Sequence, residues 1–90
     1  MITQTVEITN QRGLHARASA KFVNAVARLP EGVAVTVGKD DHRVTGDSIM
    51  GLMMLGAARG DCITISVEGE GADAALKKLV GLVVDGFGED

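Results

Sequence analysis

His15 is the residue of this sequence best suited to do chemistry, because it lies just ahead of a predicted helix and two residues before Arg17. Imidazole is a good nucleophile near pH 7, where much of it is uncharged. The opening amides of that helix, from about Ala16 to Ala18, have no partner within the helix and form the positive end of its dipole. Such an end binds anions, and the Arg17 guanidinium matches phosphate oxygens. The pattern predicts a site for a phosphorylated imidazole.

Metal and nucleotide chemistry are less well supported by the residues. A metal site would need His15, His42 and Cys62 to converge, and no pair of these ligands has a recognised spacing. One pair of glycines has the spacing of a P-loop, but Leu52 and Met53 follow it instead of lysine and serine or threonine. We therefore expect no metal and no other cofactor.

Seven segments with strand or helix periodicity must position His15, and they fit a single predicted domain, 1–90. The first helix ends before Pro30, and GKDDH at 38–42 is predicted to be a hairpin loop that exposes His42. The predicted order is strand 2–8, helix 16–29, strand 33–37, strand 42–44, helix 49–56, strand 61–67 and a last helix from 71–73 to Phe87.

The predicted strands are apolar on one face only, which is typical of an antiparallel sheet covered on one side by helices. The fold class is therefore α+β, an open-faced two-layer sandwich of four strands and three helices. Cys62 is predicted to be buried or half-buried on its strand. Glu68, Glu70 and Asp73 are predicted to form a solvated turn that caps the last helix.

Composition excludes several classes of protein. A formal net charge of −3, with no tryptophan or tyrosine, argues against binding to nucleic acid. Apolar stretches fall short of the ~20 residues that a membrane span needs, so no membrane insertion is expected. With one cysteine and no visible signal peptide, we expect a cytoplasmic protein, and a monomer is the simplest expectation.

Three segments in order resemble the HPr family of phosphocarrier proteins. They are Gly13-Leu14-His15-Ala16-Arg17 with Phe22-Val23 after it, the stretch from Gly46 to Gly56, and Gly60-Asp61-Cys62-Ile63-Thr64-Ile65. The resemblance implies the open-faced HPr fold and a carrier, not an enzyme, in the phosphoenolpyruvate-dependent phosphotransferase system. Phosphorylated enzyme I would phosphorylate His15 on Nδ1, and the group would pass to a IIA-type protein. The family usually has proline where this chain has Ala18.

The second segment implies regulation and docking. Ser48 aligns with the serine that HPr kinase/phosphorylase modifies in many relatives, although Asp47 and Ser48 are also ordinary helix-capping residues. Ile49, Met50 and Met53 match positions that dock partners in the family, and a Met-rich surface adapts to several partners. We expect two leucines of this helix to face the sheet instead, Leu52 and Leu55.

Two questions stay open at the level of sequence. His-x-Arg is a short pattern, and a histidine near a helix start is commonly a cap or a surface residue. A small acylphosphatase-like hydrolase would also use an anion-binding loop and an arginine, so it is the alternative function. The carrier could serve sugar uptake or a nitrogen-type regulatory branch, and neither the residue Ala18 nor the acidic end of the sequence decides between them.

Overall fold

The computed structural model describes residues 1–89, and the seven elements occur in the predicted order. A short turn of 3-10 helix, η1, follows the last of them. The elements are β1 (Ile2–Glu7), α1 (Ala16–Ala27), β2 (Ala34–Lys39), β3 (His42–Thr45), α2 (Ile49–Met54), β4 (Cys62–Glu68), α3 (Ala72–Val84) and η1 (Gly86–Gly88).

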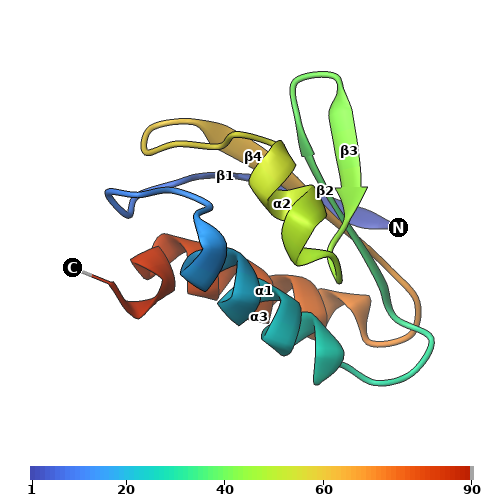
Figure 1. Cartoon of the computed structure of the whole chain (residues 1–90). Helices are drawn as coiled ribbons and strands as arrows, with labels where there is room; N and C mark the ends of the chain where they lie inside the picture. Colours follow the sequence, from blue (N-terminus) through green and yellow to red (C-terminus); the bar gives the residue numbers. More distant parts are fainter. Residues whose placement is uncertain (90) are drawn as a thin grey trace.

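The four strands form one antiparallel sheet in the order β1-β4-β2-β3, and the helices cover one of its faces (Figure 1). Side chains alternate along the strands, and in the central strands β2 and β4 the set that points to the helices is buried. The other set forms an uncovered face rich in hydroxyls, where Thr5 and Thr64 form a hydrogen bond across β1 and β4 at 3.0 Å. The predicted fold class is confirmed.

The core lies between the sheet and helices α1 and α3. Phe22 of α1 and Leu79 of α3 are fully buried against the inward-facing aliphatic residues of the strands. This packing fixes the direction of α1 and therefore the place where its first turn emerges. The strand residues in this layer are Val6, Val35, Val37, Ile63, Ile65 and Val67.

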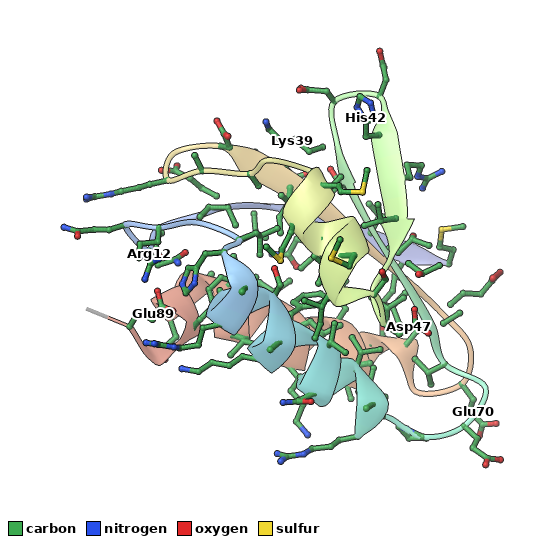
Figure 2. All side chains as sticks on the ribbon, in the orientation of Figure 1. Arg12, Lys39, His42, Asp47, Glu70 and Glu89 are labelled. Carbon is green, nitrogen blue, oxygen red and sulfur yellow. The ribbon has the colours of Figure 1, made fainter. Side chains whose placement is uncertain are left out.

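The β2–β3 hairpin is tighter than predicted. Lys39 pairs with His42, so only Asp40 and Asp41 form the turn, and Asp40 has a left-handed φ of 54°. Aspartate tolerates that conformation, which a two-residue hairpin turn requires. His42 is exposed, as predicted, at the far end of this hairpin (Figure 2).

Three predictions about the rest of the chain are wrong. Cys62 is exposed, because it points to the uncovered face of the sheet. The last helix ends at Val84, and Phe87 lies beyond it in η1 with a left-handed φ of 59°. The N-cap of α3 is Gly71, which has no side chain to accept a hydrogen bond, so neither Glu68 nor Glu70 caps the helix, and Asp73 lies within its first turn. Among residues 1–89, no helix has the length and apolar character that crossing a membrane requires.

Candidate functional site

His15 is the N-cap of α1 and has extended backbone, with φ of −73° and ψ of −179°. The loop before it is tied to the connection between α2 and β4, because Leu14 N donates to Ala57 O at 2.9 Å. Gly13 makes this approach possible, since its φ is +64° and a Cβ there would lie 2.3 Å from Ala57 O. Two anchored residues therefore hold His15 at the opening of the helix.

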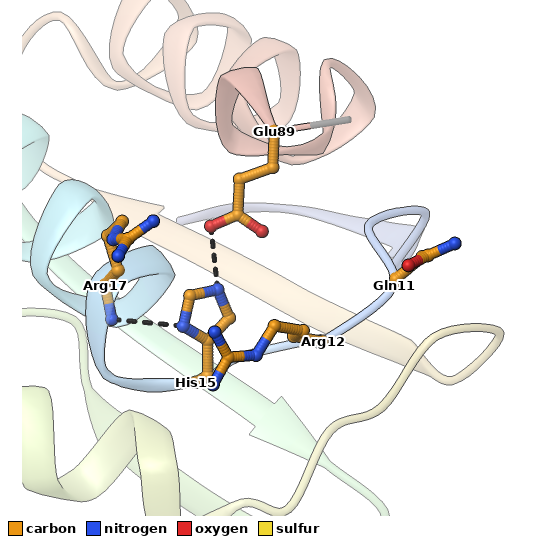
Figure 3. Close-up of a pocket in the computed structure, with 5 residues that line it drawn as sticks. All are labelled: Gln11, Arg12, His15, Arg17 and Glu89. Atoms are coloured by element: carbon orange, nitrogen blue, oxygen red, sulfur yellow. Dashed lines mark hydrogen bonds and ion pairs between the residues drawn. The ribbon is translucent and has the colours of Figure 1, made fainter.

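The two ring nitrogens of His15 have different partners (Figure 3). Nδ1 accepts a hydrogen bond from the backbone N of Arg17 at 3.3 Å, and Nε2 lies 2.7 Å from Oε2 of Glu89. An amide N–H only donates, and an ionised carboxylate only accepts. The proton of a neutral ring is therefore on Nε2, and Nδ1 presents its lone pair toward the start of α1.

Two backbone N–H groups in the first turn of α1 have no partner among the described residues. Ser19 N bonds to His15 O at 2.9 Å and completes the first turn. The amides of Ala16 and Ala18 donate no hydrogen bond to any group in residues 1–89. As predicted, the opening of the helix provides N–H groups at the positive end of a dipole, next to the imidazole.

A cavity of about 200 Å³ opens over the ring and is lined by Gln11, Arg12, His15, Arg17 and Glu89. Both arginines are exposed residues on opposite sides of His15 in the sequence, and they give the cavity two cationic walls. Guanidinium groups bind phosphate oxygens through paired N–H donors. The cavity therefore suits a doubly negative tetrahedral anion next to Nδ1.

Glu89 is held in place over His15 by further contacts. Asn10 Nδ2 donates to Oε1 of Glu89 at 3.1 Å and also to Gly13 O at 2.8 Å. Desolvation raises the pKa of the Glu89 carboxyl, but hydrogen bonds from Asn10 and His15, with the charges of His15 and Lys21, outweigh it and lower that pKa overall. Glu89 is therefore ionised at neutral pH.

The sequence did not indicate Arg12, Asn10 or Glu89 as site residues. Asn10 and Glu89 are 79 positions apart, and no pattern of residue types connects them. Arg12 had a local signal, since it is a cation three residues before His15 in a turn-rich stretch. A loop that folds back from Gly13 brings the side chains before and after it to the same cavity.

Ser48 is the N-cap of α2, and its Oγ accepts a hydrogen bond from Gly51 N at 3.0 Å. The predicted faces of this helix are confirmed: Leu52 and Leu55 are buried, whereas Ile49, Met50 and Met53 are exposed. Met54 extends the exposed set and was not predicted. Figure 1 shows α2 beside α1, with which it is in contact, on the helical side of the molecule.

The other residues with possible chemistry stay apart from this cavity. Figure 2 shows His42 at the end of the β2–β3 hairpin, far from the labelled Arg12 and Glu89 beside the site. Cys62 lies on the uncovered face of the sheet. In the part of the chain that the structure describes, no three His, Cys, Asp or Glu side chains gather closely enough to bind a metal ion.

Comparison with known proteins gives consistent matches over nearly the whole chain. Residues 2–85 match a family model described as the PTS HPr component phosphorylation site. The phosphocarrier protein HPr of Neisseria meningitidis serogroup A is 46% identical over 89 residues, which cover 99% of this chain and 98% of that protein. HPr of Pseudomonas aeruginosa is 45% identical over 85 residues, covering 93% of this chain and 92% of the relative.

The fold has the same relatives. The crystal structure of HPr-C-His from Thermoanaerobacter tengcongensis superposes with a TM-score of 0.92 and 40% sequence identity. That comparison covers 100% of this chain and 99% of the other. Sequence and structure therefore agree on the same group of proteins.

Proposed function

The chain belongs to the HPr family of the phosphotransferase system, and we propose that His15 is the residue on which it carries the phosphoryl group. Members of this family are phosphocarriers and do not catalyse a reaction on a small substrate. The alternative function, an acylphosphatase-like hydrolase, is therefore excluded. The family implies enzyme I and IIA-type proteins as its general partners.

The observation that carries the proposal is the orientation of the His15 ring. Nδ1 faces the opening of α1, while Nε2 carries the proton and is engaged by Glu89. Nδ1 is the nitrogen with a lone pair for attack on phosphorus, so the new N–P bond forms at Nδ1. The bond from the donor to phosphorus breaks, and its electron pair stays with the donor.

The backbone amides of Ala16, Arg17 and Ala18 then bind the phosphoryl oxygens. The Arg17 amide leaves Nδ1, which has used its lone pair, and joins two amides that have no partner in residues 1–89. The guanidinium of Arg17 supplies a fork of donors for the same oxygens, and Arg12 adds a second positive charge from the other side of the cavity. Transfer needs mainly positioning and charge stabilisation, and these groups supply both.

The exposed apolar side chains of α2 form the docking surface for enzyme I and IIA-type partners. Ile49 is 39% exposed and Met50 is 69% exposed, although side chains of this type are normally buried. Methionine side chains are flexible and polarisable, so one surface can fit several partners in turn. A Met50→Glu substitution should keep the fold and weaken binding to phosphorylated enzyme I. The measurement is the concentration of this chain that half-saturates phosphoryl transfer from enzyme I, which should rise.

Ser48 is the proposed regulatory phosphorylation site, for a kinase of the HPr kinase/phosphorylase type. Its half-buried hydroxyl caps the helix that carries the docking side chains. A phosphate there adds about 1.5 to 2 negative charges beside the docking surface, and the helix dipole tolerates it. Docking of acidic partners would weaken without unfolding α2.

The decisive experiment is phosphoryl transfer from phosphoenolpyruvate through enzyme I to the wild-type chain and its His15→Ala and Arg17→Ala variants. We expect one acid-labile, alkali-stable phosphate on the wild type, none on His15→Ala and slower transfer to Arg17→Ala. Phosphate on His15→Ala would refute the site, and an unchanged rate for Arg17→Ala would refute the anion-binding role. Offering the loaded carrier to sugar-type and nitrogen-type IIA proteins identifies the branch it serves.

A further inference from the structure

Resting on the proposed role of His15, we propose that Glu89 is a positioning residue with two effects on the ring. It holds the ring with Nδ1 facing α1, and it stabilises the positive charge that the ring acquires once Nδ1 bears the phosphoryl group. The 2.7 Å contact between Nε2 and Oε2 is the observation on which this proposal depends.

The backbone that delivers Glu89 adopts a costly conformation. Gly86, Phe87 and Gly88 have φ values of 65°, 59° and 73°, so three consecutive residues are left-handed. The left-handed conformation is unfavourable for a non-glycine residue such as Phe87. Its side chain is 1% exposed, so burial of the ring holds the turn in place. Strain that the surrounding structure enforces is found preferentially at functional sites.

Two polar contacts secure the same segment from α1 and from the loop before it. Lys21 Nζ donates to Phe87 O at 2.7 Å, and Asn10 Nδ2 donates to Glu89 Oε1 at 3.1 Å. The side chains of His15 and Glu89 are only 15% and 17% exposed. Water therefore screens their interaction less than it would a surface pair.

Phosphoryl transfer makes this contact stronger. Nδ1 gives its lone pair to phosphorus and the donor keeps the electrons of the bond that breaks, while the Nε2 proton stays. The neutral ring therefore becomes a phosphorylated imidazolium next to the Glu89 carboxylate. A carboxylate that orients a histidine and stabilises its cationic form acts in the same way in the Ser-His-Asp triad. The protonated ring is also the better leaving group when the phosphoryl group moves on.

The positive charges around the ring compensate two anions, the Glu89 carboxylate and the phosphoryl group. Glu89 and a phosphoryl group on Nδ1 would repel each other across one imidazole. The cationic groups that face them are Arg12 and Arg17, which line the cavity, and Lys21, whose charge acts on Glu89. Three cations and the dipole of α1 therefore compensate the phosphoryl group and Glu89 together.

The test compares Glu89→Gln with the wild type after loading by enzyme I and phosphoenolpyruvate. Phosphorus NMR of the loaded carrier gives the pH at which the phosphorylated ring loses its Nε2 proton. A neighbouring carboxylate favours the protonated ring, so Glu89→Gln lowers this midpoint by about one pH unit. At a pH above both midpoints, the variant then holds about tenfold less of the protonated ring and releases its phosphoryl group correspondingly more slowly.

Glu70→Gln is the matched control, because Glu70 is an exposed glutamate in the turn before α3. Glu89→Asp keeps the charge and should restore most of the midpoint. If Glu89→Gln and Glu70→Gln both titrate like the wild type, Glu89 has no role on the ring, while a loaded wild type still supports His15 as acceptor. A wild-type chain that enzyme I cannot load on His15 would instead overturn the proposed function itself.

Discussion

Replacing Gly13 with alanine tests whether the loop before α1 must lie against the connection between α2 and β4. A Cβ on Gly13 would lie 2.3 Å from Ala57 O and 2.8 Å from the Cα of Ala58. Both atoms belong to the backbone, so no side chain can turn away to make room. The loop must therefore shift, and the shift breaks the hydrogen bond from Leu14 N to Ala57 O.

Gly56→Ala provides the matched control for the magnitude. Gly56 has the same φ of +64° as Gly13, but a Cβ there meets no atom within 4 Å. Both variants pay about 1 to 2 kcal/mol for left-handed alanine. Gly13→Ala also loses one hydrogen bond, about 1 kcal/mol, and adds about 1 to 3 kcal/mol of overpacking strain. We expect it to lose about 2 to 4 kcal/mol more than the control.

Urea unfolding measures the two free energies, and initial rates of loading from phosphorylated enzyme I measure the effect on the site. Gly13→Ala moves His15 away from Arg17 N, so its loading rate falls, whereas Gly56→Ala loads like the wild type. Equal losses of stability in the two variants would show that only the left-handed backbone matters. The close approach to Ala57 would then not be what positions His15.

Three further predictions concern single contacts. Ser48→Ala removes the cap on Gly51 N and costs about 1 kcal/mol in unfolding free energy. The backbone hydrogen bond from Ala58 lowers the pKa of Asp61 more than desolvation raises it, and Lys39 lowers it further. The ionised Asp61 therefore stabilises the fold at pH values above its ordinary pKa of 3.8, and this stabilisation is lost as the pH falls through the lower pKa of the folded state. Asp61→Asn should lower the unfolding free energy at pH 7, and the difference from the wild type should become smaller in acid. Phe87→Ala costs about 3 kcal/mol, and Phe87→Gly about 1 kcal/mol less, because glycine accepts the left-handed backbone; an alanine variant at least as stable as the glycine one would contradict the strain at this position.

Periodicity predicted most of the strands and helices, because these have one buried and one exposed face. The exception is β3, which has no buried residue and was predicted from its place after the hairpin loop. Val35 and Val37 alternate toward the core, and Phe22 and Ala18 recur at helical spacing on the buried side of α1. The errors occur where periodicity is not the deciding force. Phe87 falls at helical spacing after Val83, yet Gly86 turns the chain into left-handed backbone and η1 begins. Cys62 was predicted to be buried or half-buried from its residue type, but its side chain lies on the outward side of β4 and is exposed to solvent.

The acceptor half of the site was predictable because it is local. His15, the first amides of α1 and Arg17 lie within four consecutive positions, 15–18, so a helix start is enough to bring them together. The other half is tertiary. Glu89 reaches His15 because α3 ends at Val84, the next turn is left-handed, and Asn10 donates a hydrogen bond to the Glu89 carboxylate. None of these three conditions has a signature in residue spacing.

Ala18 is the residue at which this chain departs from the proline that is usual in the family. Proline at that position in other members of the family would remove an N–H, whereas Ala18 keeps one that no group in residues 1–89 accepts. If the proposed binding of the phosphoryl oxygens is right, the chain offers one more backbone donor than a proline would allow. Glu89 would place an additional negative charge one imidazole away from a phosphoryl group on Nδ1. The extra donor and the guanidinium of Arg12 both act against this charge, so a carboxylate at Nε2 and a phosphoryl group at Nδ1 are compatible in one small cavity.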